Sequence, residues 1–246
     1  MKTNYRMRRG FTLVELLVVI VIIAALAGLT APMVIKQRKK ADQTEAVSNA
    51  RQIGLALFEF ETEYGNFPDP STAKAVAAAT DTTPSSGTKA NDRFRQLIRG
   101  NFAKAEMMFY AKTSYTKKPD GAFNTEQNAL SRGEVGFGMM VKTDDSGLSA
   151  SGNAARPVVM TPFTSELNEK FDFEAYDGKA VILRIDNSVV SVPIIEKSGQ
   201  VKINGKTLTE SGEDTVWGTD LNVKFAYPEP KSGGTGNSAI ENPDNL

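Results

Sequence analysis

One carboxylate lies inside the most apolar stretch of the chain, and its chemistry needs an explanation. Between Phe11 and Ile35 the only polar side chains are those of Thr12, Glu15 and Thr30. An ionised carboxylate in the lipid-embedded part of a helix costs on the order of 3 kcal/mol, and such a charge usually has a specific partner. A buried charge is tolerated when an opposite charge pairs with it. We therefore expect Glu15 to pair with a cation.

The residues around Glu15 form a recognisable motif. The segment Arg8-Arg9-Gly10-Phe11-Thr12-Leu13-Val14-Glu15, followed by the run 16–20, resembles the class III signal of the type IV pilin-like family, which includes pilins and the pseudopilins of type II secretion. The resemblance implies cleavage between Gly10 and Phe11 by a prepilin peptidase, and methylation of the new amine on Phe11. It also implies that Glu15 pairs with the Phe11 amine of a neighbouring subunit in a filament.

The same resemblance implies partners and a location. Other pilin or pseudopilin subunits would form a homo- or hetero-filament with this chain, with the help of an inner-membrane assembly platform. Before assembly the chain would lie in the bacterial cytoplasmic membrane, in contact with lipid, with its head outside the cytoplasm. Charge alone does not fix this orientation, because basic residues flank the apolar stretch on both sides: Lys2, Arg6, Arg8 and Arg9 before it, and Lys36, Arg38, Lys39 and Lys40 after it.

Two simpler explanations of the apolar stretch stay open. An ordinary secretory signal needs small residues at its cleavage site, and the stretch contains Ala24, Ala25, Ala27 and Gly28. An uncleaved membrane anchor would explain the hydrophobicity but not the position of Glu15 so close to Phe11. Such an anchored chain would be an extracytoplasmic binding or adhesion module that does not polymerise.

The composition argues against catalysis and against nucleic acid as a partner. The chain contains no histidine and no cysteine, which excludes Ser-His-Asp and Cys-His nucleophiles, imidazole metal sites and disulfides. Many type IV pilins have a disulfide, whereas pseudopilins often lack one. The formal net charge is zero, and removal of the leader would leave 25 basic and 29 acidic residues. We therefore expect no enzyme activity, no cofactor and no nucleic-acid binding.

Acidic groups in the second half of the chain are candidate calcium ligands, because some major pseudopilins carry a calcium site in the C-terminal part of the head. The group to test first is Asp172, Glu174 and Asp177. It does not match the twelve-residue calcium loop with its spaced carboxylates and closing glutamate. Solvated carboxylates in a turn explain it more simply, and we predict no metal.

One long helix is expected to position the N-terminal motif. Residues 11–35 are enough to cross a bilayer, which needs about 20 apolar residues. An amphipathic pattern then continues to about Tyr64, with its apolar positions at Ala46, Ala50, Ile53, Leu57, Phe60 and Tyr64. Pro32 cannot donate a hydrogen bond to the carbonyl of Gly28, which predicts a kink at Gly28 and Pro32.

The residue pattern after Tyr64 predicts an α+β head. Short helical segments are expected over 73–79, around 92–98 and over 103–111. Strands are expected over 135–141, 157–160, 180–185, 189–195, 200–203 and 221–226, with hairpin turns at Asp186-Asn187 and Asn204-Gly205. The apolar face of an antiparallel sheet must be covered, and the stripe of the long helix can cover it. This arrangement is the pilin architecture.

These patterns divide the chain into four segments. They are a leader over 1–10, the long helix over 11–64 with its membrane-spanning part at 11–35, a globular head over 65–227, and a tail over 228–246. The tail is rich in Pro, Gly, Ser and Asn and is expected to be mobile. The predicted function is that of a structural subunit in a type IV pilus-like or type II secretion pseudopilus filament.

Overall fold

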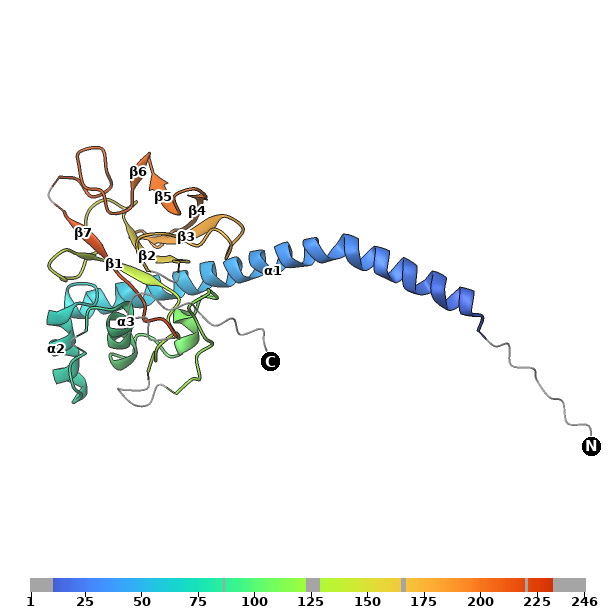
Figure 1. Cartoon of the computed structure of the whole chain (residues 1–246). Helices are drawn as coiled ribbons and strands as arrows, with labels where there is room; N and C mark the ends of the chain where they lie inside the picture. The colour runs from blue at the N-terminus through green and yellow to red at the C-terminus, as the bar shows by residue number, and fades with distance from the viewer. Residues whose placement is uncertain (1–10, 86, 123–128, 165–166, 220, 232–246) are drawn as a thin grey trace, which may run out of the picture. The chain divides into compact units, whose positions relative to one another are not determined.

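A computed structural model describes residues 11–85, 87–122, 129–164, 167–219 and 221–231 (Figure 1). The predicted leader, residues 1–10, and most of the predicted tail, residues 232–246, lie outside this part. The chain divides into two compact units, Met1–Lys39 and Lys40–Leu246.

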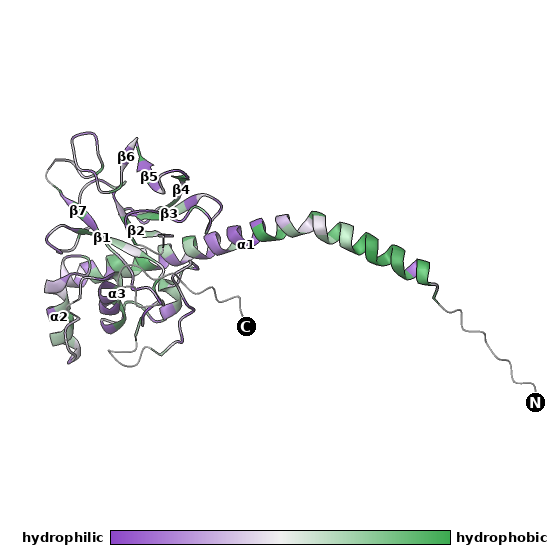
Figure 2. Cartoon of the chain, viewed as in Figure 1, coloured by the Kyte–Doolittle hydropathy of each residue, from purple (hydrophilic) through white to green (hydrophobic). Residues whose placement is uncertain are grey.

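In the first unit the described residues form the N-terminal half of helix α1 (Leu13–Tyr64). Nearly all of its side chains are apolar (Figure 2), and all of those between residues 11 and 35 are exposed. By length and composition this part can cross a membrane, a property that signal sequences share. The helix is unbroken through Gly28 and Pro32. The kink expected there stays a prediction.

In the second unit, the C-terminal half of α1 buries the row of apolar residues predicted from the sequence. Ala46, Ala50, Ile53, Leu57 and Phe60 are each at most 1% exposed. Tyr64 is partly buried against the same core. The helix ends there because Gly65 has a φ of 84° and its N–H donates to the carbonyl of Glu61 at 2.7 Å, which is a glycine C-cap. The amphipathic pattern of the sequence is confirmed.

Short helical elements follow, namely α2 (Pro70–Thr80), α3 (Ala90–Arg99) and the 3₁₀ turn η1 (Glu106–Phe109). The carboxylate of Asp69 caps α2 by accepting from the backbone N–H groups of Ser71 and Thr72, so α2 begins before the predicted residue 73. Gly100 is the C-cap of α3.

The helix predicted over 103–111 is wrong, because only the single turn η1 forms there. The amide of Asn49 on α1 donates to the carbonyl oxygens of Met107 and Tyr110, at 3.0 and 2.9 Å. The Asn49 side chain thus satisfies two backbone carbonyl groups in and just after this turn. At Tyr110 the backbone is extended, so the helix does not continue. Asn49 is itself buried, which the apolar pattern does not reveal.

Among the described residues, seven antiparallel strands form one sheet in the order β6-β5-β4-β3-β2-β1-β7. The strands are β1 (Gly138–Lys142), β2 (Pro157–Thr161), β3 (Lys179–Arg184), β4 (Val189–Ile195), β5 (Gln200–Ile203), β6 (Lys206–Thr207) and β7 (Val223–Ala226). Strands β1 to β6 follow one another as a meander, and β7 returns to pair with β1. Asn204 and Gly205 form the predicted hairpin turn, with φ values of 52° and 81°.

Strand β1 begins later than predicted for a local reason. Gly136 donates its N–H to the carbonyl of Phe109 at 2.9 Å instead of pairing in the sheet. A Cβ atom at this position would lie 2.5 Å from the backbone nitrogen and oxygen of Ala111. Only glycine therefore allows this close approach of the two segments.

A hydrophobic core joins the C-terminal half of α1 to the short helices and the sheet. Trp217 belongs to this core with 2% exposure, and its indole N–H donates to the carbonyl of Leu208 at 2.7 Å. The fold is α+β, with a long N-terminal helix and an antiparallel sheet, as predicted.

The head extends past residue 227, where the tail was predicted to begin. The N–H of Glu229 donates to Asn91 Oδ1 at 2.7 Å, and the N–H of Lys231 donates to the carbonyl of Tyr115 at 3.0 Å. Residues 228–231 are therefore attached to the head through backbone hydrogen bonds, which their polar composition does not reveal.

Candidate functional site

The N-terminus of α1 is closed by a reciprocal pair of hydrogen bonds between Thr12 and Glu15. Glu15 Oε2 accepts from the N–H of Thr12 at 2.8 Å and from its hydroxyl at 2.7 Å. In return, Thr12 Oγ1 accepts from the N–H of Glu15 at 3.2 Å. This is a capping box, in which threonine is the N-cap and the glutamate three residues later reaches back. The predicted helix start at Phe11 is therefore two residues early, since α1 begins at Leu13.

The capping box satisfies backbone donors but does not neutralise the charge of Glu15. Within the described part of the chain, no lysine or arginine forms an ion pair with this carboxylate. The positive end of the helix dipole favours a carboxylate here, with a contribution of only about 0.3–1 kcal/mol at an exposed position. Glu15 thus keeps the capacity to pair with a cation from another molecule.

The surface around Glu15 is apolar and exposed. Phe11 and Leu13 are each 79% exposed, and Leu16 is 60% exposed. A helix that is hydrophobic on all sides is stable when lipid or other protein surrounds it. The N-terminal part of α1 therefore combines an apolar packing surface with a single charge at one position along the helix.

The other predicted residues of this region are only partly described. Gly10 lies outside the described residues, while Phe11 lies within them. A Cβ atom built on Gly28 would meet nothing within 4 Å, so no contact within the described chain requires glycine there. Cleavage, methylation and the kink remain predictions.

The acidic group proposed from the sequence is not gathered into a metal-ligand arrangement in the described structure. Asp172 Oδ1 accepts the N–H of Glu174 at 2.9 Å, which is a local turn. Asp177 has a φ of 54° and precedes Gly178 in a further turn. No set of three carboxylates close enough to share an ion, among the described residues, includes Asp172, Glu174 or Asp177.

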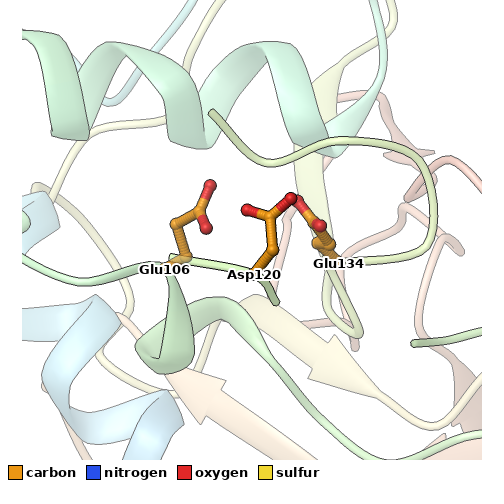
Figure 3. Close-up of side chains that lie close together, drawn as sticks. All are labelled: Glu106, Asp120 and Glu134. Carbon is orange, nitrogen blue, oxygen red and sulfur yellow. The ribbon is translucent and has the colours of Figure 1, made fainter. Parts of the chain in front are cut away.

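Three other carboxylates converge, although no motif in the sequence marks them. Glu106 from η1, Asp120 from the following loop and Glu134 from the segment before β1 each place one oxygen within 4.8 Å of the others (Figure 3). Glu106 and Glu134 are 1% and 0% exposed, while Asp120 is exposed. Burial raises the pKa of the Glu106 carboxyl above its usual value, and the nearby Glu134 and Asp120 raise it further, against hydrogen bonds from Leu130 and Gly121 that lower it.

Known proteins are similar to this chain in its N-terminal segment. A family model described as the prokaryotic N-terminal methylation motif matches residues 5–31. A type II secretion system core protein G from Pectobacterium carotovorum subsp. carotovorum is 39% identical over 67 residues, which are 27% of this chain and 42% of that protein. The core protein G of Escherichia coli K12 is 41% identical over 61 residues, 25% of this chain and 42% of that protein.

A relative with a different name shares the same segment. A fimbrial protein of Neisseria meningitidis is 33% identical over 75 residues, which are 30% of this chain and 44% of that protein. The chain thus spans less than half the length of these three relatives. No solved structure matches the chain. The motif, the long apolar helix and the α+β architecture agree with one another, and the N-terminal segment of this chain is similar to that of type IV pilin-like proteins.

Proposed function

We propose that this chain is a structural subunit of a bacterial cell-envelope filament, either a type IV pilus-like fibre or a type II secretion pseudopilus. The observation that carries the proposal is the stretch of α1 up to residue 35, which is exposed on all sides and, apart from Thr30 and the capped carboxylate of Glu15, apolar. The relatives named as secretion core proteins and as a fimbrial protein support it. Neither name denotes an enzyme, which agrees with a chain that performs no catalysis.

The proposed sequence of events starts in the cytoplasmic membrane, with the head outside the cytoplasm. A prepilin peptidase cleaves between Gly10 and Phe11, and methylation of the new Phe11 amine leaves its positive charge in place. An inner-membrane assembly platform then moves the helix from lipid into the filament. There the Phe11 amine of a neighbouring subunit supplies the cation that Glu15 lacks in the described chain.

The ion pair has a physical role that apolar packing does not supply. Lipid tails are as apolar as the α1 side chains, so transfer of the helix from bilayer to filament gains little hydrophobic free energy. Two apolar helices can also pack against each other at many different offsets along their axes. A buried carboxylate without its cation is strongly destabilising, so the pairing of Glu15 with a neighbouring amine selects one register between adjacent helices.

Substitution of Glu15 tests the proposal, and glutamine is the informative replacement. In Glu15→Gln, the side chain keeps an oxygen that accepts the Thr12 hydrogen bonds, while the charge is lost. We expect this variant to be made and inserted normally but to be absent from, or at least about tenfold depleted in, the filament fraction sheared from cells, since a buried pair contributes more than about 1.4 kcal/mol. Immunoblots of the sheared and membrane fractions measure this ratio.

The matched control is Glu59→Gln, because Glu59 is an exposed glutamate on the C-terminal half of the same helix. It should assemble like the unmodified chain. If Glu15→Gln assembles as well as Glu59→Gln, the ion pair is not the basis of assembly. If the unmodified chain never leaves the membrane fraction but binds a surface or ligand through its head, the chain is an anchored binding module instead.

A further inference from the structure

Two small apolar patches lie on the surface of the head. Among the described residues after residue 35, the large apolar side chains that are exposed are those of Leu55, at 56%, and Ile195, at 43%. Leu55 lies on α1, and the partly buried Phe58 follows three residues later. Ile195 ends β4, and the exposed Pro193 lies two residues before it. Residues at these spacings share one face of a helix or of a strand, so we call the two pairs the helix patch and the strand patch.

The two patches lie at different positions along the axis of α1. A Cβ atom on Gly54 would collide with the side chain of Asn187, just before β4. Further along β4, Ser191 Oγ accepts a hydrogen bond from the side-chain amide of Gln43 at 2.8 Å. Strand β4 therefore runs opposite to α1, and the strand patch lies beyond Ser191 in the direction of the helix N-terminus. Leu55 lies twelve residues after Gln43, so the two patches are about 18 Å or more apart along the axis.

Exposed charges of opposite sign lie next to the two patches. Arg51 lies one helical turn before Leu55, and Glu196 directly follows Ile195. Both charged side chains are exposed, and within the described structure neither forms an ion pair. Complementary charges at the edge of an apolar contact fix its orientation and disfavour wrong partners. The two patches are therefore complementary in polarity and in charge, as the two sides of one interface should be.

We infer that, in the filament, the helix patch of one subunit is covered by the strand patch of a second copy of this chain. This inference rests on the proposed function. All copies enter a filament from the same membrane in the same orientation, so their α1 helices are parallel. Parallel copies bring the two patches together only when one copy is displaced along the helix axis, by about 18 Å or more.

Such a contact is heterologous, because each subunit uses its helix patch toward one copy and its strand patch toward another. Heterologous contacts that do not close into a ring produce an open helical assembly, which is what a filament requires. The displacement also differs from that of the proposed ion pair, since Phe11 and Glu15 are only four residues apart, about 6 Å along a helix. The two patches therefore connect each subunit to a different neighbour from the one paired through Glu15.

Cysteine cross-linking tests this contact directly, because the chain contains no cysteine of its own. The test variant carries both Leu55→Cys and Ile195→Cys, two changes at exposed positions that leave the core intact. Filaments sheared from cells are oxidised and separated on a non-reducing gel. We expect a ladder of dimers, trimers and longer species, because each subunit is linked to two others. Each single variant should remain monomeric on the same gel.

The matched control combines Ile195→Cys with Ala75→Cys, because Ala75 is an exposed residue of α2 outside both patches. It should give no ladder. The inference is overturned if the variant with Leu55→Cys and Ile195→Cys forms filaments at the normal yield without cross-links, or if the control gives the same ladder. Cross-linking that stops at the dimer would indicate a two-fold contact and would also overturn it.

Reversal of the two charges provides a test that does not depend on oxidation. A single exposed ion pair contributes little, whereas like charges that face each other in an interface repel. Arg51→Glu and Glu196→Arg should each lower the amount of chain in the sheared fraction several-fold, and the two changes together should restore it. A double variant that assembles no better than the single ones would overturn the inference.

The outcomes separate this inference from the function on which it rests. If the unmodified chain forms no filament, the proposed function is wrong and the inference is wrong with it. If filaments form at the normal yield but the two patches do not cross-link, the inference alone is wrong, and the role of Glu15 in assembly stands.

Discussion

At the scale of single residues, Glu15 meets two separate requirements. In a bilayer the free N–H groups at the start of a helix have no water to bind, and each unsatisfied group costs several kcal/mol. The hydrogen bonds between Glu15 and Thr12 satisfy part of this need within one chain. The negative charge remains, and it requires a second molecule. Glutamine preserves the first function and removes the second, whereas alanine removes both.

We expect the head to lose stability in alkaline solution because the Tyr227 hydroxyl must then lose its proton. Tyr227 packs against Phe163 and Phe225, with ring centroids 5.3 and 5.6 Å away. Burial raises the pKa of Tyr227 to about 12, above the value near 10 in an unfolded chain. The folded state therefore holds this proton more tightly, so its contribution to stability is complete below about pH 10 and is lost as the pH rises through about 12.

Thermal unfolding followed by circular dichroism across this pH range measures the effect. The midpoint should fall as the pH rises, and Tyr227→Phe should show a smaller fall. Burial also raises the pKa values of Tyr115 and Tyr176, so the variant should keep part of the pH dependence. Identical pH profiles for the two proteins would contradict the role given to Tyr227.

At the scale of elements, the buried amide of Asn49 connects α1 to the end of η1. Replacing Asn49 with alanine leaves the carbonyl oxygens of Met107 and Tyr110 without this donor. We expect Asn49→Ala to lower the free energy of unfolding of the head by roughly 1–3 kcal/mol. Chemical denaturation of the purified chain checks this value, with the exposed Glu59→Ala as control. A change of less than about 0.5 kcal/mol, typical of a surface substitution, would show that the contact is not important.

Elements with strong local signals could be predicted from the sequence, and contacts between distant segments could not. The stripe from Ala46 to Tyr64 and the turn at Asn204-Gly205 follow from periodicity and turn chemistry alone. The shortening of η1 and the late start of β1 depend on Asn49 and on the close approach of Gly136 to Ala111, which involve other segments. The capping box of Thr12 and Glu15 corresponds to a Thr-x-x-Glu motif before an apolar run, a pattern typical of a helix N-terminus.

The carboxylate cluster lies beyond sequence reasoning for the same reason. Glu106, Asp120 and Glu134 are far apart in the chain and follow no ligand spacing. Only the fold brings them together. By contrast, Asp172, Glu174 and Asp177 are close in sequence, and the described structure uses two of them in local turns.

At the scale of the whole molecule, the two units are built for different surroundings. Among the described residues, none before Ala46 belongs to the hydrophobic core of the head, so we expect the head to fold without the apolar half of α1. A chain that lacks residues 1–35 should be monomeric without detergent and should unfold cooperatively, as size-exclusion chromatography and circular dichroism can show. Aggregation or a broad, non-cooperative transition would contradict this independence.

The most direct test of the central claim is the intact mass and N-terminal sequence of the chain recovered from filaments sheared from its native cells. A subunit that is processed and assembled through α1 must be present in this fraction, and it must begin at methylated Phe11. A chain that begins at Met1 and stays in the membrane fraction would identify a simple anchor. Cleavage near Ala27 would identify a secreted head, and either result would contradict the filament role proposed for Glu15 and Phe11.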